Sequence, residues 1–139
     1  MVAYSQRSDG FHGNCEFMTT ASLSAARDSL TVLDSRGGYV TIINTDAVAT
    51  ERAEELLDSL VRSSLSTIRY VPGFVSANLH VSLDRTQIVN YAQWKNQEAI
   101  AAARESSKVA ALIREQRQIA TSFTPIIYEL RQSVAAPSL

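Results

Sequence analysis

The spacing of apolar residues most restricts what this chain can fold into. Residues 39–46 (YVTIINTD) are mostly β-branched, aromatic or apolar and have the length of one strand. Across residues 50–68 the apolar positions recur every three or four residues, which predicts a helix with one apolar side. Thr50 is its expected N-cap, and Arg62 and Arg69 lie toward its C-terminal end, where the helix dipole favours positive charge.

The rest of the chain continues with a hairpin, a broken helix and a last strand. Pro72-Gly73 ends the first helix, and Ser106-Ser107 interrupts the second. The predicted segments are strands at 74–83 and 87–94 around a turn at 84–86, helices at 96–104 and 108–120, and a strand at 123–132. The order strand, helix, strand, strand, helix, strand predicts an α+β class, with the antiparallel sheet of a ferredoxin-like split βαβ fold.

The hairpin carries apolar residues on both faces of its strands. Strict alternation places Val75, Ala77, Leu79 and Val81 on one face, and Phe74 with the candidate site residues on the other. Because helices cover only one face, the second face needs cover. A second copy of the chain, or the N-terminal residues folded back within one subunit, would provide it. Light scattering after size-exclusion chromatography at several dilutions separates these alternatives.

Three segments are expected along the 139 residues. Residues 1–38, rich in Ser, Thr and Gly, form an N-terminal extension that could serve as a dimer arm or cover a pocket mouth. Within it, residues 21–33 fit a short helix or a strand equally well. Residues 39–134 form one domain, long enough for a core without disulfide or metal support, and residues 135–139 a flexible tail.

Composition excludes several classes of function. Thirteen basic against fourteen acidic residues leave no positive field for nucleic acid. The single cysteine, Cys15, cannot form an intramolecular disulfide, and no run of about 20 apolar residues predicts a membrane span. The five glycines form no phosphate loop or dinucleotide fingerprint, and no hydrolase elbow is present. A cytoplasmic protein with no membrane partner is expected.

Three polar or aromatic residues on adjoining strands stand out as candidates for a site. Alternation turns Asn90 and Trp94 to the same face, with the small Ala92 between them. Their ordinary roles would be an internal hydrogen bond for Asn90 and core packing for Trp94. Asn44, near the end of the first strand, would ordinarily make a cap or turn. Together they indicate a pocket.

Residues 72–76 (PGFVS), His80 and above all 89–94 (VNYAQW) resemble the antibiotic biosynthesis monooxygenase family, especially its cofactor-independent anthrone oxygenases of aromatic polyketide pathways. The resemblance covers about residues 39–131. It implies a homodimer whose two ferredoxin-like subunits form a dimeric α/β barrel, in agreement with the element order.

The resemblance also implies a site between helices and sheet, lined by Asn90 and Trp94. Asn44 matches an asparagine of some of these oxygenases, His80 a histidine, and Arg114 an arginine that contributes to the site. The ordinary role of Arg114 would be a solvated helix charge, although it lies beside an apolar stripe over which a long side chain could reach.

Further implied contacts and two departures concern the substrate and a turn. His80, Phe74 and Ile100 are the expected substrate-binding residues, but Ile100 stands where relatives have a tyrosine, so that hydroxyl donor is missing. At 84–85 this chain has Asp-Arg in place of Asp-Gly, so Arg85 is expected to take a positive φ.

The implied chemistry is oxidation of a small electron-rich aromatic substrate by O2 without flavin, haem or metal, for none of which the sequence has a motif. Asn44 and Asn90 would stabilise an oxyanion, Trp94 would stack on the ring, and Arg114 or His80 would favour the anionic substrate. Two alternatives stay open. Haem degradation would need a histidine after His80, and none follows; a non-catalytic barrel binding an aromatic metabolite uses the same residues.

Overall fold

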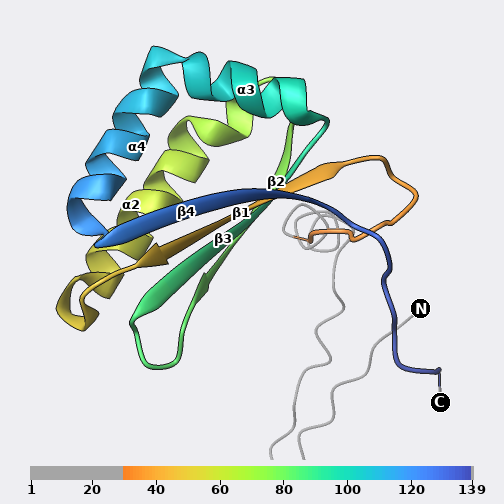
Figure 1. Ribbon diagram of the computed structural model, residues 1–139, viewed down its shortest axis with the longest axis horizontal. Helices are drawn as coiled ribbons and strands as arrows, with labels where there is room; N and C mark the ends of the chain where they lie inside the picture. The colour runs from red at the N-terminus through yellow and green to blue at the C-terminus, as the bar shows by residue number, and fades with distance from the viewer. Residues whose placement is uncertain (1–29, 139) are drawn as a thin grey trace, which may run out of the picture. The chain divides into compact units, whose positions relative to one another are not determined.

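The computed structural model describes residues 30–138, so most of the segment 21–33 and of the N-terminal extension lies outside the described residues; residues 30–33 have no regular structure. The elements follow the predicted order. They are β1 (Val40–Ala47), η1 (Thr50–Arg52), α2 (Ala53–Ser66), η2 (Ile68–Tyr70), β2 (Phe74–Val81), β3 (Gln87–Trp94), α3 (Gln97–Glu105), α4 (Ser107–Ile119) and β4 (Ser122–Glu129). The sheet is antiparallel, in the order β2-β3-β1-β4, and the three α-helices lie together on one of its faces (Figure 1). This is the ferredoxin-like arrangement.

The first helix begins three residues later than predicted. Thr50 is not its N-cap, because residues 50–52 form a 3₁₀ turn and Arg52 occupies the cap position without a side-chain cap. Arg52 instead binds Glu55 and donates to the carbonyl oxygen of Gln118 at 3.2 Å. The predicted break before α4 is confirmed, since Ser106 is extended.

One prediction about the hairpin faces is wrong. The β2–β3 register shifts between Phe74 and Ser76, so Val75 is an extra residue of β2 that has no partner on β3. Phe74 lies on the face of the site residues, as predicted, but Ala77 lies on that helix-covered face too and not on the opposite one. Leu79 and Val81 are on this face too, where they pack against the buried core cluster that contains Ile88. Strict alternation could not reveal this, because a bulge moves every later side chain to the other face.

The second face of the sheet is partly covered by residues just before β1. The hydroxyl of Thr31 donates to Asn78 Oδ1 at 2.8 Å, and Gln93 Nε2 donates to the carbonyl of Val32 at 3.1 Å. Gln93 is buried beneath this segment. The edge strand β4 leaves Ile126 and Tyr128 exposed. The last residues of the N-terminal extension thus lie on the face that the helices leave open.

The β2–β3 turn shows the expected strain. Arg85 has φ 63°, and it is the one residue other than glycine with a positive φ among residues 30–138. The side chains of Ser82 and Asp84 accept hydrogen bonds from the backbone N–H of Thr86 at 3.1 Å each, which holds this conformation. The prediction of a positive φ at Arg85 is confirmed.

Gly73 fixes the position of α3 beside the sheet. Its φ is +83°, and an added Cβ would lie 2.5 Å from the Cβ of Ala99. We expect Gly73→Ala to lower the free energy of unfolding by about 1–2 kcal/mol, from backbone strain and this contact together. Gly38→Ala is the matched control, since Gly38 has φ +72° but no atom within 4 Å of an added Cβ. Equal losses for both in urea unfolding would contradict the packing role of Gly73.

The apolar core consists of two clusters, separated by polar residues. One contains Leu56, Leu60 and Ile88, and the other contains Ile100 and Trp94. Between them, on the helix-covered face of the two central strands, lie the side chains Asn44, Asp46 and Asn90. These polar side chains separate the two apolar clusters.

Candidate active site

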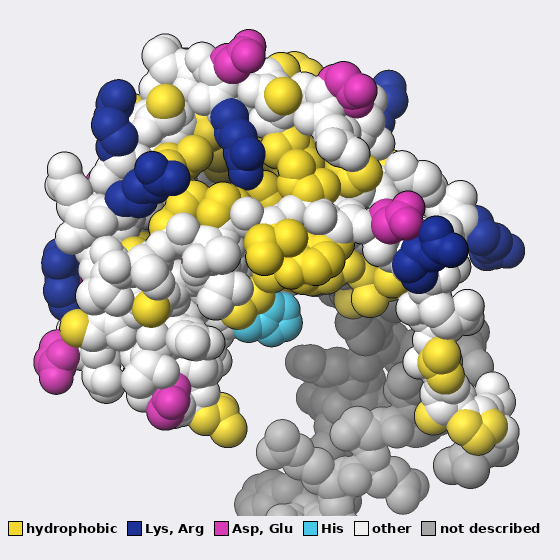
Figure 2. Space-filling view, viewed as in Figure 1, with side chains coloured by type: hydrophobic (Ala, Val, Ile, Leu, Met, Phe, Trp, Pro, Cys, Tyr) yellow, Lys and Arg dark blue, Asp and Glu magenta, His cyan; other side chains and the backbone are white. Residues whose placement is uncertain are grey.

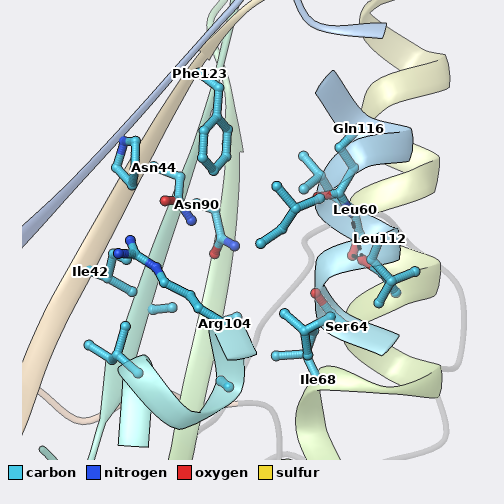
Figure 3. A pocket seen from close by; sticks show the side chains of 18 of the residues that line it. Ile42, Asn44, Leu60, Ser64, Ile68, Asn90, Arg104, Leu112, Gln116 and Phe123 are labelled. Atoms are coloured by element: carbon cyan, nitrogen blue, oxygen red, sulfur yellow. Dashed lines mark hydrogen bonds between the residues drawn. The ribbon is translucent and has the colours of Figure 1, made fainter. Parts of the chain in front are cut away.

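A cavity of about 450 Å³ lies between the sheet and the helices, where the two core clusters separate. This volume lies within the usual range for sites that bind small molecules. In Figure 3, Asn44 and Asn90 point from the strands toward Leu60 and Gln116 on the helices opposite. The walls are mainly apolar and the polar groups are few, as in a site that orients a largely apolar ligand.

Asn44 and Asn90 form a cross-strand pair on the sheet side of the cavity. They are Cα partners in the β1–β3 register, so their side chains rise next to each other. The Oδ1 atom of each is buried and accepts no hydrogen bond from residues 30–138. The internal hydrogen bond that would be the ordinary role of Asn90 is therefore not made by its Oδ1 within residues 30–138, and Asn44 lies within a strand and not at a cap or turn.

The aromatic wall of the cavity is built by Trp94 and Phe74. Their rings meet edge to face at 5.5 Å between centroids, at an interplanar angle of 85°. Trp94 is only 6% exposed, so it serves both as core and as cavity wall. Ile100 of α3 is buried beside it and also lines the cavity. These three predicted residues come together in the wall of the cavity.

Arginines surround the cavity opening. Arg114 of α4 lines the cavity as the resemblance implied, but its side chain is exposed, so it lies at the rim. Arg104 and Arg117 line it as well, and the guanidinium of Arg117 lies 4.7 Å from the ring centroid of Phe123. Figure 2 shows basic side chains beside the hollow, whose floor is apolar. Sequence reasoning missed Arg104, Arg117 and Phe123.

His80 does not belong to this cavity, contrary to the expectation. It pairs with Val89 in the β2–β3 register and is exposed. Strand alternation turns it away from Ala77, Leu79 and the helices. It therefore lies on the face opposite Asn90, and cannot contact a ligand held between helices and sheet.

Asp46 is the cavity residue that sequence reasoning overlooked. It lies two residues after Asn44 on β1, so the two side chains share a face. It is 1% exposed, and neither carboxylate oxygen has a hydrogen-bond partner within residues 30–138. Burial raises the pKa of this carboxyl to about 6. Its signal was present in the sequence, since Asp is disfavoured inside strands.

Residues 39–115 match the family model of antibiotic biosynthesis monooxygenases, which is more than half of the chain. The chain belongs to the antibiotic biosynthesis monooxygenase family. Over 98 residues it is 37% identical to the tetracenomycin-F1 monooxygenase of Streptomyces glaucescens, covering 70% of this chain and 87% of that protein. The chain is accordingly a monooxygenase of this family.

Solved structures show the same fold. The monooxygenase ActVA-Orf6 of Streptomyces coelicolor, solved in complex with nanaomycin D, superposes with a TM-score of 0.62 at 26% identity, over 75% of this chain and 96% of that one. SnoaB, a cofactor-independent oxygenase from Streptomyces nogalater, superposes with a TM-score of 0.63 at 22% identity, over 71% and 99%. The predicted fold class and family are confirmed.

The described lining of the cavity offers no axial ligand for haem iron. Among the described residues that line it there is no His, Cys, Met or Tyr, the usual axial ligands of haem iron. Within residues 30–138, no three His, Cys, Asp or Glu side chains come together as a metal-binding group.

No helix in this part of the chain is long and apolar enough to cross a membrane.

Proposed function

We propose that this monooxygenase oxidises an electron-rich phenolic substrate of the anthrone type to a quinone with O2, without a cofactor, within polyketide antibiotic biosynthesis. The observation that carries the proposal is the pair Asn44 and Asn90, whose buried amide oxygens have no partner within residues 30–138. Burying such groups is costly unless a ligand satisfies them. Two comparisons support the substrate class: the Streptomyces glaucescens relative is named for tetracenomycin F1, and the Streptomyces coelicolor monooxygenase was solved in complex with nanaomycin D.

The cavity residues would act on the substrate as follows. The substrate loses a proton, its carbanion passes one electron to O2, and the two radicals combine to a peroxide. Loss of water then leaves the quinone carbonyl, so that one CH2 group and O2 give C=O and H2O. The side-chain N–H groups of Asn44 and Asn90 would donate to the anion, and their Oδ1 atoms would accept from a phenolic hydroxyl of the substrate. The Trp94 ring would stack on the substrate and exclude water. Arg114 at the rim would favour the anionic form.

The exposed side of the sheet supports a homodimer. Ile126 and Tyr128 of the edge strand β4 remain open to solvent, whereas the segment at residues 31–32 bonds to β2 and β3. We expect two subunits to pack through this face. Light scattering at several dilutions checks it, and a monomer at all concentrations would contradict it.

The proposed activity is tested by oxygen uptake with an anthrone and chelator-treated protein. We expect uptake, one atom of ¹⁸O₂ in the quinone, and about 5-fold slower turnover for Trp94→Phe, because the smaller ring loses stacking worth about 1 kcal/mol. Tyr70→Phe is the control, an exposed aromatic outside the cavity. Binding of the anthrone without any uptake would favour the non-catalytic barrel and overturn the proposal.

A further inference from the structure

Asp46 is placed where no structural role accounts for it. A buried aspartate ordinarily pairs with a cation, caps a helix or accepts backbone hydrogen bonds. Asp46 does none of these within residues 30–138, and the ion pairs described there use other carboxylates. Both oxygens are free in a cavity-lining side chain that is 1% exposed. A buried carboxylate left without partners indicates a chemical role.

Apolar residues flank Asp46 on both neighbouring strands. Its cross-strand neighbours are Ile88 on β3 and Phe123 on β4, and α2 lines the cavity with no charged residue. The charged side chains that line the same cavity are Arg104 on α3 and Arg114 and Arg117 on α4, all exposed at the rim. Desolvation therefore dominates the pKa of this carboxyl and raises it to about 6.

Asp46 lies close enough to the amides of Asn44 and Asn90 for one aromatic substrate to reach all three. Residues two apart on a strand lie about 7 Å apart on the same face, and directly paired residues lie about 5 Å apart. Asn44, its partner Asn90, and Asp46 therefore form a triangle of the size of fused aromatic rings. A ring anion held at the amides would present a neighbouring carbon to the carboxylate.

We propose that Asp46 is the general base that removes the proton from the carbon that is oxidised. This deepens the proposed function and depends on it. The C–H bond breaks, its proton moves to Asp46, and the electron pair stays on the substrate. After O2 has accepted one electron and the C–O bond has formed, Asp46 returns its proton to the peroxide anion. The hydroperoxide then loses water, formed from its terminal OH and the second hydrogen of the carbon, which leaves C=O.

The first test separates proton removal from the oxygen step. Without O2, in D2O, wild-type protein should accelerate exchange of the CH2 hydrogens of anthrone, measured by mass spectrometry. Asp46→Asn, which keeps the shape and removes the base, should lower this exchange and kcat/KM with O2 by about 100-fold or more. Asp58→Asn, an exposed aspartate on α2, is the matched control and should behave as wild type.

The second test uses pH. The wild-type kcat/KM should rise with pH through about 6, as Asp46 loses its proton. In Asp46→Asn this rise in kcat/KM with pH should be absent. Quenching of Trp94, the one tryptophan of the chain, by the product quinone should show that the variant retains its site.

The outcomes are distinct. If Asp46→Asn retains the wild-type exchange rate and pH profile, Asp46 is not the general base, and the proposed oxygenase function is unaffected. Wild-type protein that neither exchanges nor oxidises any anthrone would overturn the proposed function, and with it the base.

Discussion

Asn90→Ala should lower kcat for anthrone oxidation by about 100- to 1,000-fold, the loss found when one well-placed donor to an oxyanion is removed. Its stability should change little, because within residues 30–138 the amide oxygen of Asn90 makes no hydrogen bond that truncation could break. Oxygen uptake gives kcat, and urea unfolding gives the free energy of unfolding. Loss of activity without loss of stability is the expected signature of a residue that serves the ligand.

Asn78→Ala provides the matched control on the neighbouring strand. Asn78 accepts from Thr31 and donates to the carbonyl of Tyr91 at 3.2 Å, on the face away from the cavity. Its truncation should cost about 1–2 kcal/mol of stability and leave kcat nearly unchanged. The converse pattern, a stable and fully active Asn90→Ala, would remove Asn90 from the site.

Asp46→Asn should stabilise the protein at neutral pH by about 2–3 kcal/mol. The pKa of Asp46 is raised from an ordinary 3.8 to about 6 by burial, and one pKa unit corresponds to about 1.4 kcal/mol. Between these two values the unfolded chain releases a proton that the folded protein keeps, so the wild-type stability falls as pH rises. Above about 6 the full penalty is present, and below about pH 4 it is absent.

The measurement compares urea unfolding of wild type and Asp46→Asn at pH 4 and pH 7.5. The difference between the two proteins should be near zero at the lower pH and grow toward the higher one. The same comparison with Asp58→Asn should give no such trend, because that side chain is exposed. A variant less stable than wild type at pH 7.5 would mean that the carboxylate is satisfied in the folded protein.

Much of the fold was predictable because its signals are local. Apolar spacing indicated each strand and helix, and alternation in residues 87–94 placed Asn90 and Trp94 on one face, as the structure shows. The shift at Val75 was not predictable, since it depends on pairing with β3. Its consequence was that the strict pattern assigned Ala77, Leu79 and Val81 to the wrong face.

The candidate site, too, was only partly predictable from the sequence. The resemblance carried by residues 89–94 indicated Asn90, Trp94, Asn44 and Arg114, and all four line the cavity. It also indicated His80, which alternation along β2 turns to the opposite face. Asp46 drew no attention as the last residue of a predicted strand.

By itself, the sequence determined the element order, the antiparallel hairpin and the shared face of Asn90 and Trp94, because each depends on residues close together in the chain. Only the tertiary structure decided that Asn44 lies directly opposite Asn90, and that the rim of the cavity is basic. It also decided that Asp46 is buried with no hydrogen-bond partner in the part of the chain that the structure describes. Burial and hydrogen bonding depend on what distant segments bring to a residue, and the pKa and stability of Asp46 follow from that environment.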